Sequence, residues 1–167
     1  MSADERLRVV LCWHMHQPQY RDLVSGQYQL PWAYLHAVKD YADMAAHLEA
    51  VPARAVVNFA PLLLEQIADY AAQVNGFLHG RRAIRDPLLA ALACPTLPAE
   101  TEARVALAKA CLRANETRLI QRFPPYRRLA DMAAWLSVHT PAATYVTDQF
   151  LADLLVWYHL AWLGETV

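Results

Sequence analysis

Two histidines stand one residue apart near the start of the chain, in the segment Trp13-His14-Met15-His16-Gln17-Pro18. The segment follows the apolar run 7–13, whose β-branched residues are typical of a strand covered on both faces. Because side chains alternate along extended backbone, we expect His14 and His16 to project from one face, about 7 Å apart. Two imidazoles beside the Gln17 amide can hold a hydroxyl-rich ligand, and a pair of imidazoles can also bind a metal ion.

A second polar group lies along residues 32–50, where apolar residues recur at three- and four-residue steps and predict a helix with one buried stripe. The apolar positions are Leu35, Val38, Ala42, Ala45 and Leu48. The polar positions are His36, Asp40, Asp43 and His47. Such a row is typical of a solvated helix face. Within this helix, His36 and Trp32 are the better site candidates, because they lie nearest the strand ends and an indole can stack on a sugar ring.

Asn58 interrupts a second β-branched run, residues 54–59. A strand, a helix and a strand in this order predict a βαβ unit with parallel strands and a right-handed crossover. The carboxyl ends of parallel strands share one edge of a sheet, where α/β folds build their binding sites. Asn58 is therefore expected either to bond to neighbouring backbone or to point toward the two histidines.

The rest of the chain is predicted to be helical, near residues 61–75, 86–93, 99–122, 125–138 and 148–163. Asp86-Pro87 and Thr147-Asp148 are typical helix starts, and Pro31 is well placed to open the helix that follows it. Two parallel strands alone leave both edges of a sheet unpaired, so we expect the chain to be structurally incomplete.

Two further groups of side chains are assigned to structure rather than to chemistry. Glu65 and Asp69 form a like-charge pair four residues apart, which is typical of a solvated face. The aromatic residues near the end of the chain are expected in the core, or on a surface that another part of the protein covers. They are Trp135, Trp157, Tyr158 and Trp162.

The composition excludes several classes of function. The 167 residues are 56% hydrophobic, which allows a real core, and 15 basic residues stand against 16 acidic ones, so no basic field for nucleic acid is present. We find neither a signal peptide nor an apolar stretch of the roughly 20 residues that span a bilayer, so we expect a cytoplasmic protein without membrane contact. The scattered Cys12, Cys94 and Cys111 are interpreted as buried thiols, because their spacing fits neither a disulfide framework nor a zinc site.

Three blocks of the sequence, taken in order, resemble the N-terminal region of glycoside hydrolase family 57, the α-amylase, amylopullulanase and glucanotransferase group. They are HMHQP at 14–18, LPWAYLHAVKDYADMA at 30–45 and VVNFAPLLLEQIADY at 56–70. His16-Gln17-Pro18 matches the first signature region of that family, and the closing LLVWYHLAWLG also fits. The resemblance covers nearly the whole chain.

This resemblance implies an α/β fold, the N-terminal part of an incomplete-type (β/α)7 barrel, predominantly helical with about two parallel strands. It also implies retaining cleavage or transfer of α-glucosidic bonds without a cofactor, on an α-glucan or maltooligosaccharide. His14, His16 and Gln17 would bind sugar near the cleavage point, joined by Trp32 and His36. With Asn58, placed by its position in the second run, they complete the candidate substrate-binding set.

The family's glutamate nucleophile and aspartate acid/base are not recognisable among residues 1–167, which we interpret as the N-terminal fragment of the catalytic domain. The remainder of that domain is expected downstream. Retaining cleavage needs two carboxyl groups about 5–5.5 Å apart, so we expect no catalytic residue and no glycosidase activity in this chain alone.

Two other functions compete with this interpretation. A metal-dependent hydrolase could bind zinc through His14 and His16, with His36 or Asp40 as a third ligand. Alternatively, the chain could be a non-catalytic piece that binds glucan or serves as a scaffold. Zinc analysis distinguishes the first, and tight glucan binding without turnover supports the second.

Overall fold

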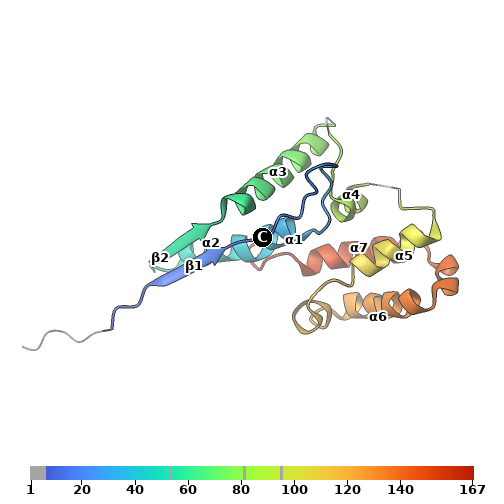
Figure 1. Ribbon diagram of the computed structural model, residues 1–167. Helices are drawn as coiled ribbons and strands as arrows, with labels where there is room; N and C mark the ends of the chain where they lie inside the picture. The colour runs from blue at the N-terminus through green and yellow to red at the C-terminus, as the bar shows by residue number, and fades with distance from the viewer. Residues whose placement is uncertain (1–6, 53, 81, 95) are drawn as a thin grey trace, which may run out of the picture.

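The βαβ unit is confirmed in the computed structural model, which describes residues 7–52, 54–80, 82–94 and 96–167 (Figure 1). Strands β1 (Leu11–Met15) and β2 (Ala55–Phe59) pair in parallel, in a register that places Leu11 opposite Ala55 and Met15 opposite Phe59. Between them run α1 (Trp32–His36), a π-helical turn η1 (Ala37–Tyr41) and α2 (Ala42–Ala50). A mostly helical α/β fold with a two-stranded parallel sheet results.

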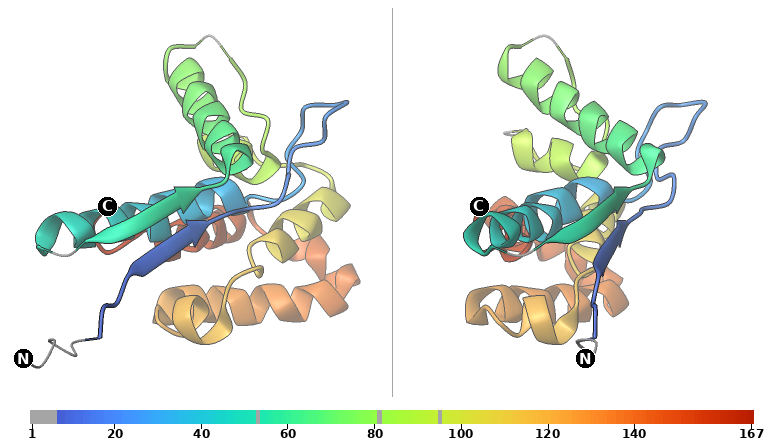
Figure 2. Two further views of the ribbon diagram at one scale, coloured as in Figure 1. Left: turned by 60° about the vertical axis from the view of Figure 1, so that its left-hand side comes forward. Right: turned by 90° about the vertical axis from the view of Figure 1, so that its left-hand side faces the viewer.

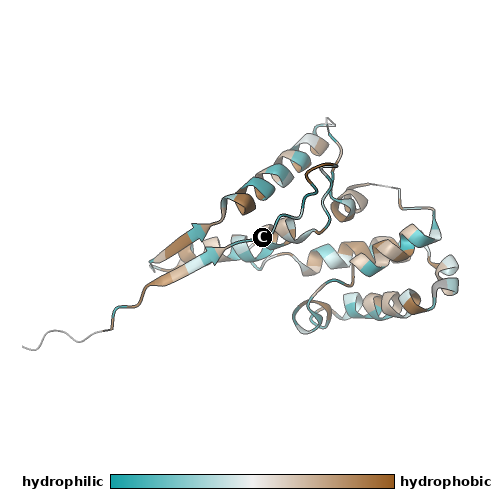
Figure 3. Cartoon of the chain, viewed as in Figure 1, coloured by the Kyte–Doolittle hydropathy of each residue, from teal (hydrophilic) through white to brown (hydrophobic). Residues whose placement is uncertain are grey.

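The prediction that the first strand is covered on both faces is wrong, and the buried stripe predicted for the helix is confirmed only in part. Leu11 is 49% exposed and Val56 is 52% exposed, although both strands are largely apolar (Figure 3). Leu11 lies on the face that buries Met15, and Val56 lies on the opposite face, which is exposed. Met15 is the buried residue of β1, whereas His14 and His16 on either side of it are exposed. In the stripe predicted along 32–50, Leu35 is buried, but Val38 is exposed and α2 buries no residue.

The remaining elements are helical, as predicted, with one important exception. They are α3 (Pro61–Leu78), α4 (Pro87–Ala93), α5 (Thr101–Ala110), η2 (Glu116–Ile120, a π-helical turn), α6 (Pro124–Val138), η3 (Thr140–Tyr145, a 3-10 helix) and α7 (Asp148–Ala161). Asp86 and Thr147 cap their helices as expected, while Pro31 stands one residue before the start of α1. The single helix predicted over 99–122 is wrong, because the chain leaves helical geometry between α5 and η2.

Helices α5, α6 and α7 pack together with α1 around the hydrophobic core (Figure 2). Tyr126, Leu154 and Tyr158 have no exposed surface there. Trp162 is also buried, as expected for a core residue, whereas Trp135 is 53% exposed. No helix of the described residues is long and apolar enough to cross a membrane.

The cysteines correct the interpretation of three buried thiols. Cys111 is buried, which raises the pKa of its thiol to about 12. Cys12 and Cys94 are exposed, Cys12 because it lies on the uncovered strand β1 and Cys94 because it follows the last residue of α4. All three are free.

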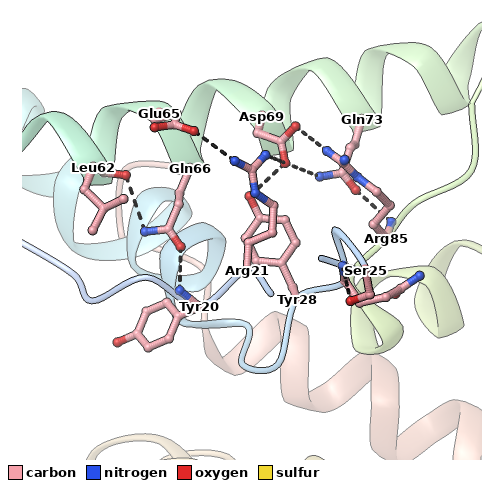
Figure 4. Close-up of polar contacts among 11 residues, drawn as sticks. Tyr20, Arg21, Ser25, Tyr28, Leu62, Glu65, Gln66, Asp69, Gln73 and Arg85 are labelled. Atoms are coloured by element: carbon pink, nitrogen blue, oxygen red, sulfur yellow. Dashed lines mark hydrogen bonds and ion pairs between the residues drawn. The ribbon is translucent and has the colours of Figure 1, made fainter. Parts of the chain in front are cut away.

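A polar network fastens the loop after β1 to α3 (Figure 4). The Asp69 carboxylate accepts hydrogen bonds from Tyr28 Oη (2.8 Å) and Gln73 Nε2 (2.9 Å) and is paired with Arg85. Arg21 donates to Glu65 Oε1 (2.9 Å) and lies 3.6 Å from Asp69. The solvated face predicted here is therefore wrong for Asp69, whose partners come from distant parts of the chain.

Candidate functional site

The strand ends bring three of the predicted site residues together. Asn58 stands opposite His14 in the register of the sheet, and Asn58 Oδ1 lies 2.6 Å from His14 Nδ1. The rings of His14 and His16 are nearly parallel, with centroids 6.1 Å apart. Of the two orientations predicted for Asn58, the structure confirms the one toward the histidines.

This contact determines what His14 can offer a ligand. An amide oxygen accepts hydrogen bonds, so Nδ1 of His14 carries the proton and donates it to Asn58. In the neutral ring, Nε2 is then an acceptor. A hydroxyl group can donate to that nitrogen, and His14 and His16 both remain exposed to solvent.

Gln17 is held between two tyrosines. Its Oε1 accepts a hydrogen bond from Tyr20 Oη (2.7 Å), and its Nε2 donates to Tyr41 Oη (3.2 Å). Burial and the nearby Tyr41 raise the pKa of Tyr20, so its hydroxyl stays protonated and able to donate. The amide is therefore fixed in orientation at the exit from β1.

His36 belongs to a charged cluster on the turn η1. Its Nδ1 and the Lys39 ammonium both bond to the Asp40 carboxylate. Partial burial alone would raise the pKa of Asp40, but the hydrogen bonds from Lys39 and His36 outweigh it and hold the pKa below its usual value. Since Nδ1 of His36 faces a carboxylate, Nε2 is the nitrogen left for a ligand.

The polar residues predicted to form one row along this helix have different partners. His36 and Asp40 bond to each other, whereas Asp43 bonds to residues near the end of the chain. The next member, Asp43, accepts hydrogen bonds from the backbone N–H groups of Glu165 and Thr166, each at 3.0 Å, and from the Thr166 hydroxyl at 2.6 Å. Val38, in the turn η1, accepts a hydrogen bond from the Gly164 N–H (3.0 Å). Asp43 therefore anchors the segment after α7, rather than only facing solvent.

An open hollow of about 480 Å³ lies beside these residues. It is lined by Gln17, Tyr20, Trp32, His36, Leu112, Arg113, Ala114, Asn115 and Trp162. Three predicted site residues, Gln17, Trp32 and His36, thus share one hollow. The other three, His14, His16 and Asn58, are not among its lining residues and form a separate group at the strand ends. The two groups adjoin where His16 is followed by Gln17.

Sequence reasoning missed the other side of the hollow. Residues 112–115 were assigned to a continuous helix and Trp162 to the core or a covered surface, although Trp162 packs its ring 5.7 Å from that of Trp32. One signal was present in the sequence, because Asn115 is a good helix cap and its Oδ1 accepts from the Arg118 N–H (2.8 Å). Nothing local indicated that this break faces the end of β1.

The metal site of the alternative interpretation needs a third ligand beside His14 and His16. Within residues 7–52, 54–80, 82–94 and 96–167, no three His, Cys, Asp or Glu side chains come together as metal ligands. Asp40 bonds to His36 and Lys39. The third ligand that a zinc hydrolase requires is therefore not supplied near His14 and His16 by this part of the chain.

Comparison with known proteins gives one result. The sequence matches the model of the family described as Glycosyl hydrolase family 57 over residues 10–150, which is most of the chain. No curated protein and no solved structure matches. The matched range contains the strand-end group and every lining residue of the hollow except Trp162.

Proposed function

The chain belongs to glycosyl hydrolase family 57, and from that premise we propose that it is the N-terminal part of a retaining catalytic domain that acts on α-glucans. Membership supports glycoside hydrolase chemistry on a carbohydrate. We further propose that residues 1–167 supply sugar-binding groups of that domain, in the cytoplasm, and that the incomplete-type (β/α)7 barrel requires further strands beside β1 and β2.

The observation that carries this proposal is the side-by-side arrangement of His14 and His16 on the exposed end of β1. With Asn58 holding Nδ1 of His14, the imidazole presents Nε2 to accept from a sugar hydroxyl. Because Met15 is buried between them, both histidines face outward on the same side. This pair would fix the orientation of one glucosyl unit near the cleavage point.

The hollow next to the strand ends would hold a neighbouring part of the glucan. Trp32 offers an indole ring for the apolar face of a sugar, and His36 offers Nε2 to a hydroxyl. Its volume of about 480 Å³ is within the usual range for small-molecule sites. An aromatic surface with a few fixed polar groups is the ordinary composition of such a site.

We propose that the catalytic Glu/Asp pair lies outside residues 1–167. Retaining cleavage requires two carboxyl groups about 5–5.5 Å apart. None of the residues that line the hollow is Asp or Glu, and Asp40 behind it is bonded to His36 and Lys39. These residues would therefore bind and orient sugar, while groups elsewhere break the bond.

Isothermal titration with maltoheptaose tests this proposal. The chain should bind maltoheptaose but not cellohexaose, and chromatography of the incubated sugar should show no shorter product. His16→Ala should weaken binding about tenfold, as expected for one lost hydrogen-bonding group in a binding site. His79→Ala is the matched control, because His79 is exposed and, among the described residues, its side chain bonds to the Asn75 carbonyl of the preceding helix.

The outcomes separate the possibilities. If neither sugar binds, or if His16→Ala and His79→Ala behave alike, the proposed sugar-binding role is wrong. If the purified 167-residue chain releases shorter maltooligosaccharides, the catalytic pair is present after all, and that part of the proposal fails. Stoichiometric zinc that is lost in His14→Ala would favour the metal-dependent alternative.

A further inference from the structure

The break between α5 and η2 forms one side of the hollow that is lined on its other side by Gln17 and His36. We propose that Arg113 and Asn115, in this break, bind hydroxyl groups of a neutral glucosyl unit and determine how it sits in the hollow. This inference rests on the proposed function, since it assigns residues to a second side of the same binding site.

The break is held in place by the helical core. The Tyr126 hydroxyl donates to the Cys111 carbonyl at 2.5 Å, and the Tyr158 hydroxyl donates to the Arg113 carbonyl at 3.5 Å. Tyr126 and Tyr158 have no exposed surface, so neither can move without disturbing the core. The backbone that carries Arg113 and Asn115 is therefore positioned before any ligand binds, as a binding site requires.

Arg113 and Asn115, on this side of the hollow, have side-chain N–H groups that donate no hydrogen bond to any described residue. The Arg113 side chain is exposed, and its guanidinium makes no hydrogen bond or ion pair with any residue that the structure describes. Asn115 uses Oδ1 to accept from the Arg118 N–H, which leaves its Nδ2 available as a donor. Both residues line the hollow.

Trp162 supplies an independent observation at the same place. Its side chain is nearly buried and lines the hollow, yet its Nε1 has no hydrogen-bond partner among the described residues. A buried indole N–H is normally paired, so Trp162 is an exception among the described residues. The Nε1 atom has almost no accessible surface, so a ligand oxygen in the hollow would accept from it only after the Trp162 ring turns.

The hydrogen-bonding groups on the two sides of the hollow indicate which class of ligand it can bind. Arg113 and Asn115 donate, while Nε2 of His36 can accept, and Trp32 provides an apolar ring. Hydroxyl groups on a sugar ring both accept and donate, and its C–H face packs on aromatic surface. A glucosyl unit therefore satisfies both sides of the hollow at once.

Isothermal titration of maltotriose into the full chain and its variants tests the inference. Arg113→Met should weaken binding about tenfold, and Arg113→Lys should weaken it less, because a point charge replaces the lost donors only in part. Asn115→Asp should weaken it about fivefold, because the aspartate still caps η2 toward Arg118 but no longer donates. Arg128→Met is the control, since Arg128 is exposed on α6 and does not line the hollow.

Unfolding by denaturant is measured on the same samples and should be unchanged in all four variants, since none of them removes a buried contact. Wild-type binding with the expected losses supports the inference. Wild-type binding that His16→Ala weakens but Arg113→Met and Asn115→Asp do not would overturn the inference alone and leave the proposed function standing. Absence of wild-type binding to both maltotriose and maltoheptaose would overturn the proposed function, and the inference with it.

Discussion

The helical half of the molecule, α5 to α7, and its sheet side, β1, β2 and α2, bury their apolar residues to very different degrees (Figure 2). Leu154 and Tyr158 on α7 are fully enclosed, whereas Leu11 and Val56 on the strands are about half exposed. Hydrophobic stabilisation follows the area removed from water, so the folding free energy of the described chain is concentrated in the helices. The sheet side carries the histidines but contributes much less to stability.

The candidate site lies where these two regions meet. Gln17 comes from the end of β1 and His36 from the start of the crossover helix, while residues 112–115 and Trp162 come from the helical half. The well-packed region thus provides a rigid surface, and the exposed region provides the strand-end imidazoles. Four measurements test this division.

The largest expected effect is at the centre of the helical core. Leu154→Ala should lower the free energy of unfolding by about 2–5 kcal/mol, because it leaves a cavity among fully buried neighbours. Leu11→Ala, the same change on β1, should cost less than about 1 kcal/mol, because half of that side chain is already in water. Urea denaturation of both variants measures the difference. Equal losses would show that the sheet side is as well packed as the helices.

A loss almost as large is expected at the buried Asp86. Its Oδ1 accepts from the backbone N–H groups of Leu88 and Leu89, and its Oδ2 accepts from the Tyr70 hydroxyl at 2.7 Å. Asp86→Ala should cost about 2–4 kcal/mol, because it removes a helix cap and leaves a buried hydroxyl unpaired.

Asp131→Ala, at an exposed position on α6, is the matched control for Asp86 and should change stability by no more than about 0.5 kcal/mol. Thermal unfolding followed by circular dichroism compares the two variants. If they behave alike, the hydrogen bonds of Asp86 do not contribute to stability as proposed.

His159 on α7 bonds to α1, the first helix of the crossover between the strands, and should make stability depend on pH. Its Nδ1 donates to the Leu155 carbonyl, and its Nε2 accepts from Tyr34 Oη on α1, both at 2.8 Å. Burial holds its pKa below the usual 6.5, so the unfolded chain takes up a proton more readily than the folded one. Its contribution is therefore complete above pH 6.5 and is lost as the pH falls below that value.

The slope from this single proton cannot exceed about 1.4 kcal/mol per pH unit. Urea denaturation of the wild type and of His159→Gln between pH 4.5 and 8 isolates it, because all other titrating groups are common to both proteins. Parallel curves would show that His159 titrates normally and that its bond to Tyr34 does not couple α1 to α7.

The smallest effect is expected at Asp43, which is partly exposed at the surface. Hydrogen bonds from the Thr166 hydroxyl and from the Glu165 backbone lower the pKa of Asp43 below 3.8. The anchoring of residues 164–166 should therefore hold above pH 3.8 and be lost as the pH falls below it. The amide chemical shift of Thr166 should report this step, and the step should be absent in Asp43→Asn. A Thr166 shift that follows some other titration would contradict the assignment.

Much of the fold could be predicted because its signals are local. The second β-branched run, the Asp86-Pro87 start of α4 and the Thr147 cap of α7 are confirmed where the sequence places them. The first strand begins at Leu11, four residues after the start of the run 7–13. Local rules describe these features well, since propensity, capping and periodicity depend on near neighbours.

The errors occur where distant partners decide the structure. Asp69 is not solvated, because Arg85 and Tyr28 reach it from other segments. The helix expected over 99–122 breaks after α5, where the Cys111 carbonyl accepts from Tyr126 and Asn115 caps η2. No periodicity reports such contacts, and the same break forms one side of the candidate site. Two members of the predicted site, His14 and Asn58, are together because strand pairing alone aligns them.

The alternation along β1 bears on how this protein can vary. His14 and His16 face outward only because Met15 between them faces the core. A deletion or insertion of one residue within Leu11–Met15 would reverse every side chain beyond it, burying both imidazoles and expelling the thioether. Length changes there should be strongly selected against, whereas the exposed loop at 22–25 lies between two anchored ends and can change length freely. The strand that positions the two histidines is therefore also the segment in which an insertion or deletion should be tolerated least.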